Sequence, residues 1–571
     1  MPDARRTGLS LTAAYYRITG PFRQRADRIL SVMTRDLSRL ADAPFDVLVV
    51  GGGVHGLAVA YDAAQRGFTT ALVERADFGS GSSFNHARTV HGGLRSLQTG
   101  DVLKARFSLR ERRAIARIAP NLVTPLSFVM ATTRSLTRSR LALRAGFLAD
   151  ALLGFDRNAG VAAHLRLPAG HVIGRASYRE IFGDNARAYA TGGAMWVDYH
   201  MPESDRLTLA FAKAACAHGA ALANYVEAVE PLTQPGRVGG VRARDCLGGA
   251  TFDIRARITV NAAGAASRAW MEKLGGSPRF PLLKAMNLVT SRPAGPVALG
   301  APTSGGRLLL IAPWHGRMLV GTSHSDRPSE ADDLLVRRGE LTAFVDEVNS
   351  AFPALALTEA DVTLVHRGVV PAERGRGGVL ALMGHHRIHD HAADGLDGAI
   401  SITGVKYTTG RGVAEQVVDL VAHKLGRAGA PCRTGTARLP GCEADTAGSE
   451  AARATAESGN VLADELITSL VGTHGTGWRA VVALCREDPS LADPIAPGCP
   501  FPKAAVVHAI RSEMACTLAD VLVRRLPVGA AAHPGEAVLS ACASLMAGVC
   551  GWGADRVSRE AEAVREIYRI M

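Results

Sequence analysis

The fold is decided by Phe45-Asp-Val-Leu-Val-Val-Gly-Gly-Gly-Val-His-Gly56, in which a short apolar run leads directly into a glycine-rich turn. Apolar residues with helical spacing follow the turn, and Gly67 ends this predicted helix. Residues 69–73 then form a second apolar run of strand length. A strand, a helix and a strand in this order predict a βαβ unit with two parallel strands.

The turn between the first strand and the helix carries the pattern G-x-G-x-x-G at Gly51, Gly53 and Gly56. The first glycine allows a tight turn, the second lets the backbone approach a diphosphate, and the third lets the helix pack closely on the strand. The diphosphate would lie at the positive N-terminal end of the helix. Glu74 follows Gly56 by 18 residues, where a carboxylate is expected to bind the ribose hydroxyls. The motif therefore predicts a dinucleotide site.

The identity of the dinucleotide is a separate question. A carboxylate at Glu74 disfavours a 2′-phosphate, although Arg75 beside it weakens that argument, so NAD and FAD both fit the βαβ unit. Two later turns, at residues 260–264 and 402–409, each follow a predicted strand. They favour FAD, because its isoalloxazine must be held at the end far from the first turn.

Length and composition are those of a globular protein with several domains: 571 residues, of which 47% are hydrophobic and 21% are charged. This profile excludes a disordered chain, a collagen-like repeat, a small disulfide scaffold and a polytopic membrane protein. The net charge of +12 favours anionic partners, but the chain has no basic runs interleaved with aromatic residues, so we predict no nucleic-acid partner. Nine cysteines without a C-x-x-C pair predict free thiols in a reducing compartment, and we expect a cytoplasmic protein.

Several further segments resemble motifs of the FAD-dependent glycerol-3-phosphate dehydrogenase family and occur in the family's order, from about residue 33 to residue 565. They are Val73-Glu-Arg-Ala-Asp-Phe-Gly-Ser-Gly-Ser-Ser83, His91-Gly-Gly-Leu-Arg95, Ile311-Ala-Pro-Trp314, Gly404-Val-Lys-Tyr-Thr-Thr-Gly-Arg411 and the helical stretch at 503–522. The resemblance implies an α/β FAD-binding domain of the Rossmann-like, doubly wound type. It also implies an inserted antiparallel-sheet substrate domain and a C-terminal all-α domain.

The patterns along the chain and the resemblance together imply four regions. Residues 1–44 are an N-terminal extension with a helix, and residues 45–280 are the FAD-binding domain, with a helical insertion near 100–190. Residues 395–430 complete that domain, residues 281–394 form the substrate-binding domain, and residues 445–571 form the C-terminal helical domain.

The resemblance also implies the site residues. FAD would be held by Gly51, Gly53, Val54, His55, Gly56, Glu74, Arg75, Ser82, Ser83, Gly92, Gly93, Ala263, Gly264, Gly404, Val405, Lys406, Tyr407 and Thr408. The family passes a hydride from an alcohol carbon to flavin N5. Arg95 and Lys406 match two basic residues of its active site, and both suit an anionic substrate. His91, as a base, and Asn287, in the place of a family histidine, complete the catalytic candidates.

The departures from the family concentrate in the expected substrate pocket. Ser96 replaces a tyrosine, Asn287 replaces a histidine, and Val370 replaces an arginine. His385 and His386 lie where the family has a Ser-Arg-x-His segment, so a second arginine is lost. An amide cannot accept a proton at neutral pH, and two lost arginine contacts to a phosphate remove ~3–6 kcal/mol of binding.

These changes lead to the hypothesis of a FAD-dependent oxidoreductase that acts on a C–OH or C–N carbon of an anionic small molecule other than glycerol 3-phosphate. One alternative is a genuine glycerol-3-phosphate dehydrogenase that forms dihydroxyacetone phosphate and whose phosphate site is rebuilt from Arg367, Arg374, Arg376 and Arg387. A second alternative is a catalytically inactive flavin-binding partner protein. The substrate-pocket candidates are Ser96, Arg367, Val370, His385 and His386.

Three further questions concern partners and metals. Residues 141–153 have an apolar face flanked by four arginines, Arg138, Arg140, Arg144 and Arg157. This leaves open a peripheral contact with the inner face of the membrane, with a quinone as electron acceptor. A homodimer is open as well. The histidines of residues 385–391 match no metal-binding spacing, so we predict no metal site.

Overall fold

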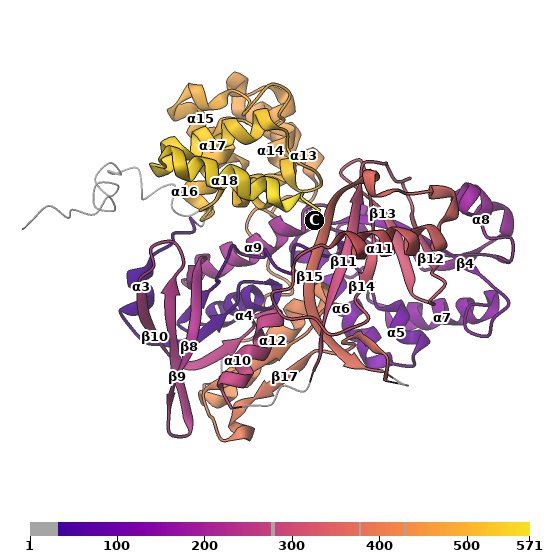
Figure 1. Ribbon diagram of the computed structural model, residues 1–571, viewed down its shortest axis with the longest axis horizontal. Coiled ribbons are helices and arrows are strands. Elements are labelled where there is room, and N and C mark those ends of the chain that lie inside the picture. Colours follow the sequence, from indigo (N-terminus) through magenta and orange to yellow (C-terminus); the bar gives the residue numbers. More distant parts are fainter. Residues whose placement is uncertain (1–31, 276–279, 376–377, 428–429, 571) are drawn as a thin grey trace, which may run out of the picture.

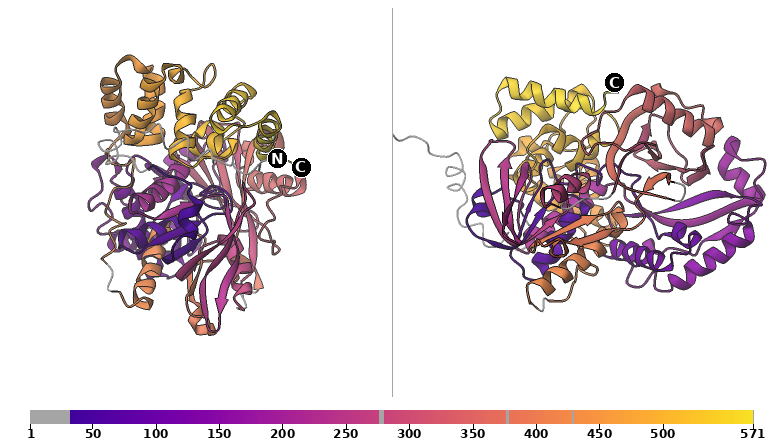
Figure 2. Two further views of the ribbon diagram at one scale, coloured as in Figure 1. Left: turned by 90° about the vertical axis from the view of Figure 1, so that its left-hand side faces the viewer. Right: turned by 60° about the horizontal axis from the view of Figure 1, so that its bottom comes forward.

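A computed structural model gives the fold, and the structure describes residues 32–275, 280–375, 378–427 and 430–570, with Arg95 and Gln98 described only in their backbone. The predicted N-terminal extension lies mostly outside these residues, and its described part holds the short helix α3 (Leu37–Ala41). Two sheets form the body of the molecule, and the C-terminal helices lie at one end of it (Figure 1). Figure 2 shows these helices, in orange and yellow, lying across both sheets.

The first sheet has eight strands within the described residues and contains the βαβ unit. Five strands are parallel, in the spatial order β18–β10–β1–β2–β7, and β17 is the antiparallel edge strand. β8 and β9 extend β10 as an antiparallel meander. The strands are β1 (Phe45–Val50), β2 (Thr70–Val73), β7 (Ala221–Ala223), β8 (Val226–Gln234), β9 (Arg237–Asp245), β10 (Thr251–Asn261), β17 (Arg387–Asp390) and β18 (Ala399–Thr403).

Helices cover both faces of this sheet. α4 (Val54–Gln65) packs between α9 (Ser204–Ala217) and α12 (Gly410–Lys424) on one face, where a large apolar core lies. The other face is covered by the meander together with α3 and α10 (Ser267–Lys273). The predicted βαβ unit is confirmed as β1–α4–β2, with the helix beginning directly after Gly53.

The second sheet has ten strands within the described residues, and all their pairings are antiparallel except that of β12 with β4. Its strands from residue 281 onward agree with the antiparallel sheet that the sequence analysis expected there. The strands are β3 (Thr89–Val90), β4 (Thr124–Thr132), β5 (His171–Ile173), β6 (Gly192–His200), β11 (Leu282–Thr290), β12 (Ala298–Pro302), β13 (Leu308–Trp314), β14 (Arg317–His324), β15 (Val362–Arg374) and β16 (Leu380–Leu382).

Two features of the second sheet differ from the sequence prediction. The region near 100–190, predicted as a helical insertion, also contributes strands β4 and β5 and leads directly into β6, and all three belong to this sheet. β4 pairs with β6 over nine residues, a contact between segments about 60 residues apart that a local pattern cannot reveal. Conversely, β17 lies within the predicted substrate-binding segment 281–394 but pairs with β18 of the first sheet.

Five helices accompany the second sheet. α11 packs on the apolar face that is formed by strands β11, β13, β14 and β15. α5, α6 and α7 lie next to one another, and α6 also contacts α12. Their bounds are α5 (Leu94–Gln98), α6 (Val102–Ile118), α7 (Arg140–Leu153), α8 (Arg175–Phe182) and α11 (Arg338–Ala351).

The C-terminal helices form their own apolar core and are anchored to the first sheet through buried charges. Asp77, which follows β2, accepts hydrogen bonds from Arg524 (2.6 Å) and Arg525 (2.7 and 2.8 Å). Arg206 on α9 donates two bonds of 2.8 Å to Glu513. Removal of one member of such a buried pair leaves an uncompensated charge. The helices are α13 (Ala447–Ser458), α14 (Asp464–His474), α15 (Trp478–Glu487), α16 (Lys503–Ser512), α17 (Glu536–Cys550) and α18 (Ala554–Ile567).

No helix in the described part of the chain combines the length and the apolar character needed to cross a bilayer.

Candidate functional site

In the glycine turn after β1, the backbone makes close contacts that only residues without side chains allow. Gly51 has a φ of +106°, and a Cβ at this position would lie 2.6 Å from the carbonyl oxygen of Ala262. A Cβ on Gly56 would lie 1.9 Å from the carbonyl oxygen of Gly51. Helix α4 therefore approaches β1 closely because residue 56 is glycine. Ala263 and Gly264 follow Ala262, so the two segments predicted to hold the nucleotide meet at one edge of the sheet.

Two side chains hold the backbone of this turn in place. The Glu74 carboxylate accepts hydrogen bonds from the backbone N–H of Gly52 (2.6 Å) and of Ala76 (2.9 Å). Burial raises the pKa of Glu74, and these two bonds oppose that effect. From the other side, Ser83 Oγ accepts a hydrogen bond of 2.9 Å from the N–H of Val54 at the start of α4. The carboxylate predicted to bind a ribose therefore lies directly beside the glycine turn.

The late turn at residues 404–409 lies between β18 and α12, on the same side of the sheet. Residues 404–406 line a cavity, whereas Tyr407 points into the protein and its hydroxyl lies 2.8 Å from Thr208 Oγ1. Thr408 Oγ1 accepts a hydrogen bond of 3.3 Å from the backbone N–H of His91. The turn thus connects the cavity with the His-Gly-Gly segment that sequence analysis singled out.

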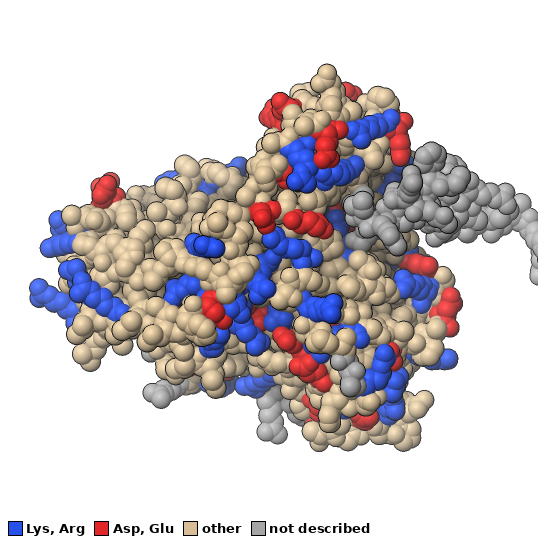
Figure 3. Space-filling view, turned by 180° about the vertical axis from the view of Figure 1, so that it is seen from behind, with Lys and Arg blue, Asp and Glu red and all other residues tan. Residues whose placement is uncertain are grey.

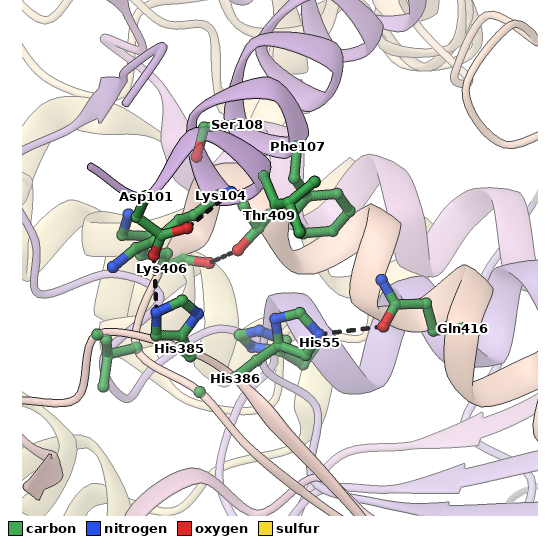
Figure 4. A pocket seen from close by; sticks show the side chains of 14 residues that line it. His55, Asp101, Lys104, Phe107, Ser108, His385, His386, Lys406, Thr409 and Gln416 are labelled. Atoms are coloured by element: carbon green, nitrogen blue, oxygen red, sulfur yellow. Dashed lines mark hydrogen bonds and ion pairs between the residues drawn. The ribbon is translucent and has the colours of Figure 1, made fainter. Parts of the chain in front are cut away.

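The cavity has a volume of about 390 Å³ and opens between helices α6 and α12 and the loop that connects β16 to β17 (Figure 4). It is lined by α6 and α12, by the loop between β16 and β17 and by the turn after β18, and His55 reaches it from the first turn of α4. The lining residues are His55, Asp101, Leu103, Lys104, Phe107, Ser108, Gly384, His385, His386, Gly404, Val405, Lys406, Thr409 and Gln416.

Polar contacts connect the walls of this cavity. His385 Nε2 lies 2.8 Å from Asp101 Oδ2, and the other carboxylate oxygen of Asp101 accepts from the backbone N–H of Lys104, which caps helix α6. His386 Nε2 lies 3.1 Å from Gln416 Oε1 on α12. Figure 4 shows these two histidines on one loop, facing the helices. The arrangement offers cations and imidazoles to a small anionic molecule.

The His-Gly-Gly segment is fixed by a buried ion pair. The carboxylate of Asp198 on β6 accepts hydrogen bonds from the backbone N–H of Gly92 (2.8 Å) and from the guanidinium of Arg112 on α6. Gly93 begins α5 with a φ of +80°, and a Cβ there would lie 2.9 Å from Ser108. The segment therefore needs both glycines to pass beneath α6 at this distance.

Two histidines beside the cavity are held in the neutral form. Burial lowers the pKa of His55 to about 4, and His386 adds to this effect. Burial also lowers the pKa of His91 to about 4, with a further contribution from Lys406. His55 Nε2 is buried and has no hydrogen-bond partner in the described structure. Neutral imidazoles can accept a proton at physiological pH, which a protonated imidazole cannot.

A buried ion pair holds the two helical walls of the cavity together. Arg411 on α12 donates to both carboxylate oxygens of Glu111 on α6, at 2.6 and 2.5 Å. A Cβ on the neighbouring Gly412 would lie 2.6 Å from the Glu111 carboxyl carbon. The glycine after Arg411 is thus what allows the two helices to come within reach of this bidentate contact.

Several predicted pocket residues lie away from the cavity. Asn287 is buried in β11, where its Oδ1 accepts a hydrogen bond of 2.7 Å from Thr322, and Ser96 is buried in α5. Val370 lies on β15, and Arg367 of the same strand donates to the carbonyls of Val365 and Ile567. None of these four residues lines the cavity described above, and neither does His91, whose backbone N–H bonds to Thr408 beside it. The side chain of Arg95 is outside the described residues.

The remaining predicted residues surround the nucleotide edge. Arg75 is exposed directly after Glu74, and Ser82 Oγ donates a hydrogen bond of 3.3 Å to the carbonyl of Val369 on β15. The sequence analysis missed Asp101, Lys104 and Phe107 on α6 and Gln416 on α12, which all line the cavity. A helix pattern shows which residues are apolar, but only the packing of α6 against α12 shows which of its polar residues face inward.

These features fit a dinucleotide with a ring system at its far end. The glycine turn, the start of α4 and the Glu74 carboxylate suit a diphosphate and a ribose. The cavity begins at His55, whose buried Nε2 lacks a partner, and continues to the turn at residues 404–406. The residues that would hold FAD are therefore grouped along one path across the carboxyl ends of the parallel strands, where ligands bind in such sheets.

Comparison with known proteins identifies two family models along the chain. Residues 46–420 match the model of FAD dependent oxidoreductases. Residues 432–557 match the model of the C-terminal domain of alpha-glycerophosphate oxidase.

Individual relatives cover nearly the whole chain. A glycerol-3-phosphate dehydrogenase of Synechocystis is 30% identical over 555 residues, which is 93% of this chain and 98% of that protein. The crystal structure of the glycerol-3-phosphate dehydrogenase of Bacillus halodurans, complexed with FAD, matches with a TM-score of 0.72 and 24% identity, covering 93% of this chain and 96% of that one. The L-alpha-glycerophosphate oxidase of Mycoplasma pneumoniae matches with a TM-score of 0.51 and 14% identity, covering 70% and 99% of the two chains.

Proposed function

The chain belongs to the FAD-dependent glycerol-3-phosphate dehydrogenase family, and from this premise we propose that it oxidises a small anionic substrate other than glycerol 3-phosphate. FAD is its cofactor, and when bound it would supply the hydride acceptor for a substrate carbon that carries a hydroxyl or an amino group. The identity of the substrate depends on which charged side chains reach the cavity.

The observation that carries the proposal is the position of the arginines. Arg367 donates to the Val365 and Ile567 carbonyls (3.3 and 3.2 Å), so its guanidinium points to the C-terminal helices. Arg374 and Arg387 are exposed, and neither lines the cavity. These described arginines, which could have replaced the two lost from the family motifs, are therefore not placed to bind a phosphate in it.

The size of this effect supports a substrate other than glycerol 3-phosphate. Each charge-assisted hydrogen bond to a phosphate contributes ~1.5–3 kcal/mol, so the loss of two weakens binding by roughly a hundred- to ten-thousandfold. Lys104 and Lys406 remain in the cavity as cations. Two lysines provide point charges that suit a carboxylate or another small anion, without the bidentate geometry with which arginine binds a phosphate.

We assign the following roles to the residues of this chain. Lys406 and Lys104 orient the anionic group of the substrate toward the flavin end of the cavity. His91 accepts the proton that leaves the hydroxyl or amino group, since burial and the neighbouring lysine keep its imidazole neutral. Phe107 and the α6–α12 contact at Arg411 exclude water from this side.

Glycerol 3-phosphate itself is the second candidate. It is supported by the names of relatives that are about 30% identical to this chain, and by the two lysines in the cavity. Under this reading, lysines rather than arginines would neutralise the phosphate.

Anaerobic stopped-flow reduction of the flavin separates these possibilities. FAD-loaded protein is mixed with glycerol 3-phosphate and with a panel of 2-hydroxy acids, 2-amino acids and phosphorylated alcohols, and dithionite serves as the control for reducible flavin. We expect an acid of the panel to bleach the flavin at least a hundredfold more efficiently than glycerol 3-phosphate. Rapid bleaching by low concentrations of glycerol 3-phosphate would contradict the proposal. A flavin that only dithionite reduces would support an inactive binding protein instead.

The pH dependence of flavin reduction tests the role of His91. A base with the ordinary imidazole pKa of about 6.5 would lose roughly fourfold in rate between pH 8 and pH 6, because most of it becomes protonated. The pKa of His91 is about 4, so we expect the rate to stay level over this range. The measurement uses the best substrate of the panel at saturation. A fourfold fall toward pH 6 would exclude His91 in its buried, neutral state as the proton acceptor.

The surface beside the cavity supports a membrane partner. α7 exposes Leu141 (77%), Leu148 (63%) and Leu152 (68%) on one side, and Phe155 (80%) follows at its end. Figure 3 shows, at the left end that carries α7 and α8, more Lys and Arg than Asp and Glu among uncharged surface. Arg106 on α6 joins the end of α7 by donating to the Leu153 carbonyl. We propose that this face, named the α7 face, lies on an anionic bilayer, from which a quinone can reoxidise the flavin.

Vesicle sedimentation tests the α7 face. The double variant Leu148→Glu/Leu152→Glu should bind vesicles with one-third anionic lipid at least tenfold more weakly than the unaltered protein, since each buried leucine contributes ~1.5–3 kcal/mol. The control is Leu247→Glu, at an exposed leucine (41%) in the turn before β10. If the double variant and the control bind equally well, the α7 face is not the membrane contact.

A further inference from the structure

A cluster of two histidines and an aspartate lies at the edge of the first sheet, outside the flavin site. His389 lies on the edge strand β17, and His391 follows two residues later at the start of a short turn, with the two ring centroids 4.6 Å apart. A short turn from His391 to Asp394 ends at Gly395, whose φ is +82°, and returns the chain to β18. This turn brings Asp394 back to the two histidines. Strand β17 is labelled in the lower part of Figure 1.

The three side chains converge on a small space. Asp394 Oδ2 lies 2.6 Å from His389 Nε2 and 3.2 Å from His391 Nδ1. One donor atom from each residue lies within 4.8 Å of both of the others. The sequence analysis predicted no metal because it considered only residues 385–391, and the third donor lies just beyond that segment.

We propose that His389, His391 and Asp394 bind one divalent transition-metal ion of the zinc class, through His389 Nε2, His391 Nδ1 and the Asp394 carboxylate. Imidazole nitrogen suits Zn²⁺, Ni²⁺ and Cu²⁺. Three protein ligands leave one tetrahedral position to water. The ion would join the edge strand to the turn that follows it.

The charges around the cluster favour a cation. Asp394 supplies a carboxylate and the histidines supply imidazole nitrogens, and metal binding uses the ionised carboxylate and the neutral imidazole. The nearby Lys424 is engaged by Asp390 (2.8 Å) and Asp397 (2.6 Å). Within the described residues, the ion pairs of Asp394 are those with the two histidines.

The partners of His391 resemble the outer shell of a metal site. His391 Nε2 lies 2.8 Å from Ser401 Oγ, which also accepts a hydrogen bond of 3.1 Å from Asn261. A bond at Nε2 fixes the ring and leaves Nδ1 to face the ligand. Asn261 Oδ1 in turn accepts from the N–H of Ala263, beside the glycine turn. An ion at the cluster would thus stiffen a chain of contacts that ends at the nucleotide edge.

A second cluster with similar residue types shows what excludes a metal. His474, His508 and Glu513 also lie close together, but all three are buried. Glu513 already accepts hydrogen bonds from Arg206 (2.8 Å) and Lys213 (2.5 Å). Two cations on one carboxylate repel a third, so this cluster is an anchor between α9 and the C-terminal helices. The cluster at Asp394 has no such competitor among its described contacts.

Metal titration of the FAD-loaded protein tests the proposal. The protein is treated with chelator and dialysed, and Zn²⁺ and Ni²⁺ are then titrated separately by calorimetry, with the metal content measured after desalting. We expect one ion per chain with micromolar affinity. Asp394→Asn and His389→Gln should each weaken binding at least tenfold, while the control His164→Gln, at an exposed histidine elsewhere, should leave it unchanged.

Flavin absorbance and circular dichroism show whether each variant is folded. If Asp394→Asn does not fold, His389→Gln decides, because His389 lies partly exposed at the sheet edge. Absence of binding at 100 micromolar metal, in roughly tenfold excess over protein, would overturn the proposal, as would unchanged binding by a folded His389→Gln. Neither readout depends on the substrate, so the test is independent of the proposed reaction.

Discussion

Gly56→Ala is expected to leave the protein almost without FAD, with an occupancy below about a tenth of that of the unaltered chain. The added methyl group would lie 1.9 Å from the carbonyl oxygen of Gly51, which no Cβ tolerates, so α4 must move away from β1. That movement displaces the positive end of the helix from the place where a diphosphate binds. The clash is with backbone, and no side chain can rotate away to relieve it.

Absorbance of the purified protein at the flavin band, relative to protein absorbance, measures this effect. The matched control is Gly146→Ala in α7, where a Cβ would meet no atom within 4 Å and the backbone has an ordinary helical conformation. This control should keep its flavin and gain about 1 kcal/mol of helix stability. Normal flavin content in Gly56→Ala would contradict the assignment of the glycine turn as the dinucleotide site.

Lys406→Met is expected to slow flavin reduction by roughly a hundred- to a thousandfold, measured per bound FAD. Lys406 lines the cavity within the turn between β18 and α12, and its charge contributes to the lowered pKa of His91. Methionine keeps the length and apolar stem of the side chain but removes the charge. A loss in the reduction rate therefore reports an electrostatic contribution to the reaction.

Single-turnover kinetics under anaerobic conditions separate binding from chemistry in this variant. Lys104→Met, in the same cavity, should chiefly raise the substrate concentration needed for half-maximal reduction, because we propose that Lys104 binds the anionic group of the substrate. Lys503→Met, at the start of α16 in the C-terminal helices, is the control outside the cavity. Equal rates for Lys406→Met and Lys503→Met would remove Lys406 from the reaction.

The fold of the first sheet could be predicted because its signals are local. The strand β1, the glycine turn and the start of α4 are adjacent in sequence, and each has a pattern of its own. The pairing of β4 with β6 could not be predicted in the same way, because two strong helices lie between these strands and dominate the pattern. Sheet register between distant segments depends on packing that no single window of sequence contains.

The candidate site likewise has parts that the sequence predicts and parts that it does not. The turn at residues 404–409 carries a motif and lies between strand β18 and helix α12, next to the cavity. Arg367, in contrast, was a candidate because of its position in the chain. On strand β15 its side chain is directed toward the carbonyl of Ile567 and not into the cavity. Asp394 escaped notice because a carboxylate in a short turn has no distinguishing pattern until the turn closes on two histidines.

The cavity has a consequence for how the cell makes this protein. Its walls come from His55 near the beginning of the described chain and from Gln416 more than 350 residues later, and the Arg411–Glu111 contact between them forms only when both helices exist. When the ribosome has synthesised the glycine turn but not α12, one wall of the cavity is therefore still missing. We therefore expect tight FAD binding only after synthesis has passed α12, and until then the unfinished edge is exposed to aggregation.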